Sequence, residues 1–167
     1  MRTLLSTEKP EFFQHKRVEE NSWLISPLEK DVSGPEIEKE LLARVPGAEV
    51  SRRVVPDEQE RILEALEACA GADFILTTGG TGISPRDVTP EATRRFCEKE
   101  LPGIAEALRA ESLRETPAAM LSRGYAGLRG HTVVVNFPGS PKAARTCVRV
   151  IAPLMEHAGK MLRGEGH

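Results

Sequence analysis

The stretch from Phe74 to Ala92 constrains the fold of this chain more than any other part of its sequence. It reads FILTTGGTGISPRDVTPEA, in which a short apolar run precedes the glycine-rich loop Gly79-Gly80-Thr81-Gly82 and then Thr89-Pro90-Glu91. The apolar run predicts a buried strand. Thr89 as an N-cap, with Pro90 at the first helical position, predicts the start of a helix. A strand that reaches a helix through a glycine-rich loop exposes backbone N–H groups to an anion such as phosphate.

Acidic and hydroxyl side chains accompany the glycines of this loop. They are Asp87 and Glu91, together with Thr81, Ser84 and Thr89. Carboxylate and hydroxyl oxygens are suitable ligands for a hard cation, so the sequence predicts a phosphate cradle with cation ligands beside it. The glycines alone would also fit an ordinary turn, but the PRD and TPEA strings that follow make the pattern more specific.

Composition limits the class of protein. The chain has 167 residues, 40% apolar and 29% charged, with a net charge of −2, which is typical of one soluble globular domain. That charge gives no reason to expect nucleic acid or an anionic membrane as partner, and no apolar run is long enough to cross a bilayer. Cys69, Cys97 and Cys147 fit no zinc spacing. With no signal-peptide pattern at the N-terminus, we expect reduced thiols in a cytoplasmic protein.

Helical and strand patterns alternate from Ser33 onward. Ser33 with Glu36, and Asp57 with Glu60, have the spacing of helix capping boxes. The predicted helices cover 33–45, 57–69, 90–99, 104–113 and 141–162, and the predicted strands cover 48–55, 74–76 and 131–137. Residues 116–130 favour a short helix followed by a turn or small hairpin. This alternation predicts one α/β domain of three layers, with a doubly wound, mostly parallel sheet.

The first strand is ambiguous, because residues 1–32 contain two short apolar pieces. One is Thr3-Leu4-Leu5 and the other is Trp23-Leu24-Ile25. We therefore treat 1–32 as an atypical N-terminal segment and 33–163 as the domain proper.

Candidate site residues follow successive strands. Asp57 comes after the second strand, the glycine loop after the third, and Pro138-Gly139-Ser140 after the valine-rich strand. Because ligands of doubly wound sheets bind beyond the carboxyl ends of the strands, we expect these loops to converge on one crevice. Asp57 could instead be only a helix N-cap. Lys142 falls in a first helical turn, where the dipole disfavours a cation, which hints at an anionic ligand, although a solvated lysine also fits.

Four motifs together resemble the MogA/MoaB family of molybdopterin adenylyltransferases, which act in molybdenum cofactor synthesis. They are DVSGPE (31–36), VVPDE (54–58), TTGGTGISPRDVTPEA (77–92) and VNFPGSPKAA (135–144), and the resemblance covers about residues 31–162. It implies a molybdopterin-binding domain that assembles as a homotrimer or a dimer of trimers. It also implies hand-over of the product to a molybdenum insertase.

The resemblance implies a reaction and a set of site residues. The terminal phosphate of molybdopterin attacks the α-phosphate of ATP, pyrophosphate leaves, and Mg²⁺ assists. Asp57 and Asp87 match the family's important carboxylates and are assigned to Mg²⁺ binding and orientation. The residues matching the loops that bind phosphate, pterin and nucleotide are Ser33, Gly34, Gly79, Gly80, Thr81, Gly82, Pro138, Gly139, Ser140 and Lys142.

The sequence departs from the family at its first strand. The family's threonine-valine-serine-aspartate run is missing, and Leu24-Ile25-Ser26 is followed by a proline where aspartate is expected. If Leu4-Leu5-Ser6-Thr7 is the strand instead, Glu8 is the nearest acid. A second function is therefore retained as an alternative: a non-catalytic molybdopterin-binding carrier or partner protein of the same family.

Overall fold

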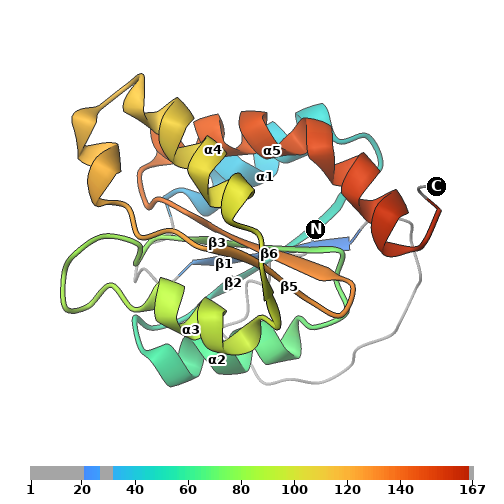
Figure 1. Cartoon of the computed structure of the whole chain (residues 1–167), viewed down its shortest axis with the longest axis horizontal. Coiled ribbons are helices and arrows are strands. Elements are labelled where there is room, and N and C mark those ends of the chain that lie inside the picture. The colour runs from blue at the N-terminus through green and yellow to red at the C-terminus, as the bar shows by residue number, and fades with distance from the viewer. Residues whose placement is uncertain (1–20, 27–31, 166–167) are drawn as a thin grey trace.

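The computed structural model describes residues 21–26 and 32–165 and shows helices on both sides of one sheet (Figure 1). The strands are β1 (Asn21–Ser26), β2 (Glu49–Val54), β3 (Phe74–Thr78), β4 (Lys99–Glu100), β5 (Ala126–Arg129) and β6 (Thr132–Phe137). The helices are α1 (Gly34–Arg44), α2 (Gln59–Ala68), α3 (Thr89–Phe96), α4 (Pro102–Leu113) and α5 (Pro141–Leu162), with a 3₁₀ helix η1 (Pro117–Leu121). Among these residues, no helix is long and apolar enough to span a bilayer.

The sheet has the strand order β2-β1-β3-β6-β5-β4. The first four strands are parallel, whereas β5 pairs antiparallel with β6 and β4 antiparallel with β5. The expected doubly wound, mostly parallel sheet is confirmed, with an antiparallel edge in addition. Because the chain moves outward from β1 to β2 and then returns to β3 on the other side of β1, the strand order reverses between β1 and β3. In doubly wound sheets this is where ligands bind.

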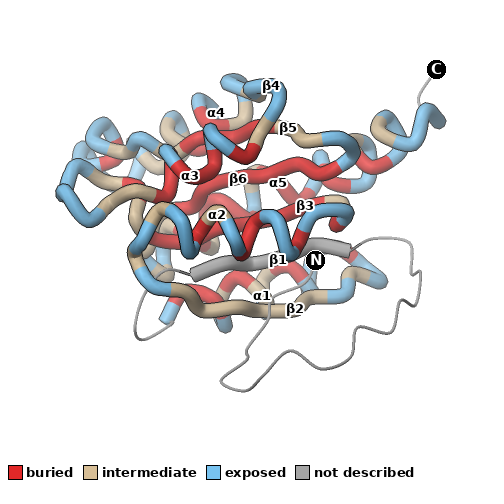
Figure 2. The backbone as a smooth tube through the Cα atoms, turned by 90° about the horizontal axis from the view of Figure 1, so that it is seen from below, coloured by how far each residue is buried: buried red, intermediate tan, exposed pale blue. Residues whose placement is uncertain are grey.

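Two apolar cores lie on opposite faces of the sheet. On one face α1, α4 and α5 pack against Phe74, Leu76, Val133, Val135 and Phe137. On the other face α2 and α3 pack against Ile75 and Val134. These two residues point to the opposite side of the sheet because successive side chains of a strand alternate between its faces. Figure 2 shows β3 and β6 buried along their whole length. A strand buried on both faces has successive side chains in the core, which is why each of these two strands contains a run of three apolar residues, 74–76 in β3 and 133–135 in β6.

The first strand is formed by the second of the two apolar pieces. Trp23-Leu24-Ile25 lies within β1, which pairs with both β2 and β3 inside the sheet. The alternative piece, Thr3-Leu4-Leu5, lies outside the described residues. The segment 116–130 contains η1 and then β5, which forms a hairpin with β6 through Gly130, whose φ is +54°.

Of the three predicted N-cap positions, one is confirmed and two were wrong. Ser33 occupies the cap position of α1 but makes no side-chain cap bond, because its hydroxyl is used elsewhere. The cap position of α2 is Glu58, so Asp57 precedes it. The cap position of α3 is Val88, and Thr89 is the first helical residue.

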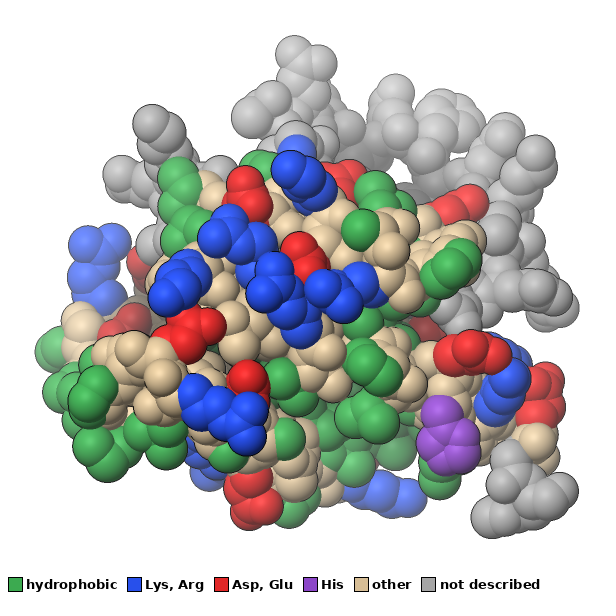
Figure 3. Space-filling view, turned by 90° about the horizontal axis from the view of Figure 1, so that it is seen from above, with side chains coloured by type: hydrophobic (Ala, Val, Ile, Leu, Met, Phe, Trp, Pro, Cys, Tyr) green, Lys and Arg blue, Asp and Glu red, His purple; other side chains and the backbone are tan. Residues whose placement is uncertain are grey.

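Charged side chains cover the outer surface of α1 and α5 (Figure 3). Glu40 of α1 binds Arg149 of α5 at 2.9 Å and Arg44 of its own helix at 2.7 Å. Glu36 binds Arg145 at 2.8 Å. The basic residues visible on this face are therefore largely neutralised by glutamates.

Candidate functional site

The loops that follow β1, β3 and β6 are hydrogen-bonded to one another at the carboxyl edge of the sheet. The Gly79 N–H donates to the carbonyl oxygen of Phe137 at 3.1 Å. The Thr78 hydroxyl donates to the carbonyl oxygen of Pro138 at 2.9 Å, and Ser33 Oγ lies 2.9 Å from Thr78 Oγ1. Of the three loops predicted to converge, those after β3 and β6 meet here, together with the start of α1. Asp57, which follows β2, lies 3.7 Å from Arg86 in the segment after the glycine loop.

The direction of the Ser33–Thr78 bond follows from counting protons. A hydroxyl carries one hydrogen, and that of Thr78 is used on Pro138. Ser33 must therefore donate to Thr78 Oγ1. Both side chains are fully buried, so they fix the loops relative to one another from beneath.

The glycine loop is closed by its own hydrogen bonds. The Ser84 N–H donates to Asp87 Oδ2 at 2.9 Å, and the Asp87 N–H donates to the Ser84 carbonyl oxygen at 2.9 Å. The Thr89 N–H donates to the carbonyl oxygen of Gly80 at 3.1 Å. A β-carbon on Gly82 would lie 2.9 Å from Asp87 Oδ2, so glycine is needed there for the Asp87 carboxylate to keep its place.

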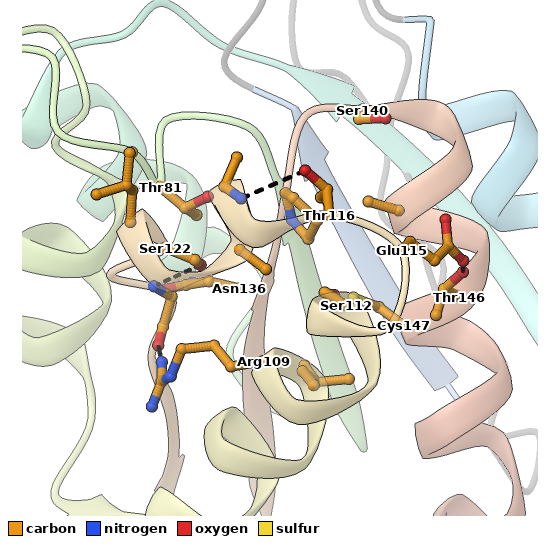
Figure 4. Close-up of a pocket in the computed structure, with 18 of the residues that line it drawn as sticks. Thr81, Arg109, Ser112, Glu115, Thr116, Ser122, Asn136, Ser140, Thr146 and Cys147 are labelled. Atoms are coloured by element: carbon orange, nitrogen blue, oxygen red, sulfur yellow. Dashed lines mark hydrogen bonds between the residues drawn. The ribbon is translucent and has the colours of Figure 1, made fainter.

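A cavity of about 370 Å³ opens beside the glycine loop, between α4, η1 and the start of α5 (Figure 4). Much of its wall is apolar or small, including Leu108, Ala118, Ala119 and Leu121. Its polar lining comes from Thr81, Arg109, Ser112, Glu115, Thr116, Ser122, Asn136, Ser140, Lys142 and Thr146. A cavity of this size, largely apolar with a few polar groups, is suited to a flat heteroaromatic ring.

An ion pair lies at the α5 side of the cavity. Lys142 Nζ lies 2.9 Å from Glu115 Oε2, and the Thr146 hydroxyl donates to Glu115 Oε1 at 2.8 Å. The hydrogen bonds from Lys142 and then from Thr146 lower the pKa of Glu115. Lys142 is therefore paired with a carboxylate rather than merely solvated.

Cys147 lies in the same wall, and burial raises the pKa of its thiol to about 12. The thiol is accordingly protonated at neutral pH and a poor nucleophile.

Buried Asn136 connects the cavity to the opposite face of the sheet. Its Nδ2 donates to Thr77 Oγ1 and to Thr93 Oγ1, both at 2.8 Å, and its Oδ1 accepts from the Tyr125 N–H at 3.1 Å. Thr93 Oγ1 in turn donates to the Thr89 carbonyl oxygen at 2.9 Å. This satisfied network holds the first turn of α3, and hence the end of the glycine loop, against β3 and β6.

Glu91, in the first turn of α3, pairs with Arg123. Partial burial acts to raise the pKa of Glu91, but the hydrogen bond from Arg123 and the other favourable interactions outweigh it and leave the pKa lowered. Arg123 also donates to carbonyl oxygens of the glycine loop, those of Gly82 and Asp87.

The two carboxylates expected to bind Mg²⁺ lie in neighbouring loops. Asp57 is mostly buried and lies 3.7 Å from Arg86, which belongs to the same loop as Asp87. No cluster of three metal-ligating side chains occurs among the described residues. Mg²⁺ commonly uses one or two carboxylates, substrate phosphates and waters. Two carboxylates such as Asp57 and Asp87 have the donor chemistry of that kind of site. Thr89, two residues after Asp87, has a buried hydroxyl oxygen without a partner in the described part of the chain.

The structure divides the predicted site residues into two sets. Thr81, Gly82, Pro138, Ser140 and Lys142 line the cavity. The others are not among its lining residues: Ser33, Gly34, Asp57, Gly79, Gly80, Ser84, Asp87, Thr89, Glu91 and Gly139.

The residues of α4 and of the segments on either side of η1 that form the far wall were not predicted from the sequence. They are Arg109, Ser112, Glu115, Thr116 and Ser122. The TPAAMLSR string, which begins at Thr116 and includes Ser122, was the available signal.

Residues 22–157 match the sequence family described as "Probable molybdopterin binding domain". The chain belongs to this family. The match begins within β1, in agreement with Trp23-Leu24-Ile25 as the first strand.

Relatives of this molybdopterin-binding family share the fold over most of the chain. The MoaB structure from Thermus thermophilus superimposes with a TM-score of 0.77 at 42% identity, covering 88% of this chain and 98% of that one. A molybdopterin adenylyltransferase of Helicobacter pylori J99 is 37% identical over 139 residues, which are 81% of this chain and 79% of the relative. The molybdenum cofactor synthesis protein cinnamon of Drosophila melanogaster is 43% identical over 133 residues. That match spans 78% of this chain but only 22% of the cinnamon protein. The resemblance to the MogA/MoaB family is confirmed.

Proposed function

We propose that this protein is a molybdopterin adenylyltransferase of molybdenum cofactor biosynthesis, which transfers AMP from ATP to the phosphate of molybdopterin and releases pyrophosphate. The observation that carries the proposal is the junction of the glycine loop with the cavity. Thr81 and Gly82 belong to both, so a ring bound in the cavity would place its phosphate at the loop. The relative from Helicobacter pylori, which bears this activity in its name, matches over most of both chains.

The pterin would occupy the cavity, and the phosphates would lie on the glycine loop. The attack of one phosphate on another brings like charges together, so the site must supply positive charge and hydrogen-bond donors. Backbone N–H groups of Gly80 to Gly82 and the ammonium of Lys142 are suited to this role. Lys142 would exchange its bond with Glu115 for a phosphate oxygen. No general base is needed, because the attacking oxygen is already ionised.

Asp57 and Asp87 would hold Mg²⁺ and fix its place relative to the loop. The chemistry that Mg²⁺ would supply there is positive charge to offset the negative charge of the reacting phosphates. Asp87 is suited to orienting a ligand because the Ser84 N–H already restrains one of its oxygens at 2.9 Å.

We also propose a homotrimer or a dimer of trimers in the cytoplasm, as the family resemblance implies. Cys69, Cys97 and Cys147 form no disulfide among the described residues, which fits a reducing compartment. Because related domains occur in longer proteins such as cinnamon, we expect direct hand-over of the adenylylated product to a molybdenum insertase.

A single-turnover assay tests the function. Purified protein, molybdopterin, Mg²⁺ and α-labelled ATP should give labelled, adenylylated molybdopterin, and Asp57→Ala and Asp87→Ala should abolish it. Tight molybdopterin binding without any transfer would reject the enzyme and support the alternative carrier function.

A further inference from the structure

Arg123 connects the cavity wall to the glycine loop. Its neighbours Ser122 and Gly124 line the cavity. Its own N–H donates to the Thr81 carbonyl oxygen at 2.8 Å. Its Nε donates to the Gly82 carbonyl oxygen at 2.6 Å, and its two Nη atoms reach the Asp87 carbonyl oxygen and the Glu91 carboxylate.

The acceptors of Arg123 lie at both ends of the segment 82–87, which connects the glycine loop to α3, and in α3 itself. Gly82 is the first residue of this segment and Asp87 is its last, whereas Glu91 belongs to α3, the helix that follows. A planar guanidinium has five N–H donors in fixed directions, so it can bind three such acceptors at once. A lysine ammonium is a flexible point charge, and it cannot reproduce this arrangement.

The contacts of Arg123 specify geometry more than they add stability. The side chains of Arg123 and Glu91 are 39% and 44% exposed, and ion pairs this exposed contribute little to folding. Hydrogen bonds to two loop carbonyls from a residue 36 to 41 positions away instead restrict the shape of the loop.

We propose that Arg123 is a positioning residue for the transferase site, with Glu91 holding its guanidinium in place. It keeps the glycine loop, and with it Asp87, at a fixed distance from the cavity, so that phosphate and pterin subsites stay aligned. This inference rests on the proposed function for its catalytic consequence, but the loop geometry can be tested without it.

The first test is amide hydrogen exchange of the protein without ligands. In Arg123→Lys and Arg123→Ala, the amides of residues 80–88 should exchange roughly tenfold faster or more than in the wild type. Arg95→Lys is the matched control. Arg95 of α3, like Arg123, forms an ion pair with a glutamate, Glu60 of α2, but among the described residues it donates no hydrogen bond to a loop carbonyl. Its loop exchange should stay at the wild-type rate.

The second test is turnover with molybdopterin, ATP and Mg²⁺. Arg123→Lys should lower kcat roughly 100-fold, the effect of misplacing reacting groups by about 1 Å, with a much smaller change in KM for ATP. Thermal unfolding of the same variant checks that it remains folded. Arg95→Lys should keep kcat within about twofold.

The outcomes separate the two claims. Wild-type loop exchange or wild-type kcat in Arg123→Lys would overturn the positioning role, because a charge alone would then suffice. Absence of transfer by the wild-type protein would instead reject the proposed function, while the exchange measurement would still decide whether Arg123 orders the loop.

Discussion

Ser33 Oγ and Thr78 Oγ1 lie 2.9 Å apart in the buried base of the site, at the point where the strand order reverses between β1 and β3. Thr78 donates its own hydrogen to the Pro138 carbonyl oxygen, so the pair ties three loops together: those after β1, β3 and β6. The hydroxyls therefore hold the shape of the site rather than the ligand.

Thr78→Val should destabilise the protein by about 1–3 kcal/mol, because valine has the same shape but leaves Ser33 and the Pro138 carbonyl without their partner. Urea unfolding measures the loss. Thr78→Ser keeps the hydroxyl and should recover more than half of the difference. Equal stability of the valine variant and the wild type would show that the buried hydroxyls are not needed.

Gly82→Ala should displace the Asp87 carboxylate, since the new β-carbon would lie 2.9 Å from Asp87 Oδ2. We expect kcat/KM for adenylyl transfer to fall roughly tenfold or more. The free energy of unfolding should fall by about 1 kcal/mol, because the hydrogen bond from the Ser84 N–H to the Asp87 carboxylate is lost. Gly103→Ala on α4 is the matched control, because its β-carbon meets open space. It should stabilise the protein by about 0.5 kcal/mol and leave turnover unchanged. Full activity in Gly82→Ala would show that adenylyl transfer does not depend on the position of the Asp87 carboxylate.

Glu115→Gln should tighten ATP binding roughly two- to fivefold, because it removes a negative charge beside the cavity and releases Lys142 to a phosphate. Titration calorimetry at low and high salt should show the gain shrinking as salt screens the charges. Glu111→Gln, which breaks the pair with Arg114 on the same helix, is the control and should bind ATP like the wild type. Weaker ATP binding by Glu115→Gln would mean that this carboxylate supports the site instead.

Glu40 should contribute to acid sensitivity. Hydrogen bonds from Arg149 and then Arg44 lower its pKa from an ordinary value near 4.5. A lowered folded-state pKa means that the stabilisation is complete above the unfolded value and is lost as the pH falls through the range below it. The free energy of unfolding should therefore fall less between pH 5 and about pH 3 in Glu40→Gln than in the wild type. Glu106→Gln, on α4 and outside this ion-pair cluster, should keep the wild-type slope.

The sequence predicted the architecture well because the parallel core leaves little choice. β3 and β6 are buried on both faces, each contains a run of three consecutive apolar residues, and each is followed by a glycine- or proline-rich loop. Those two facts alone placed Gly79 and Pro138 side by side at one edge of the sheet.

The other half of the cavity could not be read from the sequence. Its wall is formed by small apolar and single polar residues of α4 and η1, such as Ala119 and Ser112, and these types occur on any helix. Arg123 was missed because its acceptors are backbone carbonyls that only the folded loop presents.

The capping bond predicted at Ser33 failed for a related reason, namely that this side chain has a tertiary partner. Ser33 satisfies the local pattern of a cap, yet its hydroxyl binds Thr78, 45 positions away. Tertiary hydrogen bonds of this kind override local propensity and leave no trace in the spacing of residues.

The most direct test of the account is a crystal structure of the protein with adenylylated molybdopterin. It predicts the pterin between α4 and η1 within the cavity, the phosphates at Gly79 to Gly82, and Lys142 moved from Glu115 to a phosphate oxygen. A pterin bound outside this cavity, or phosphates remote from the glycine loop, would contradict it.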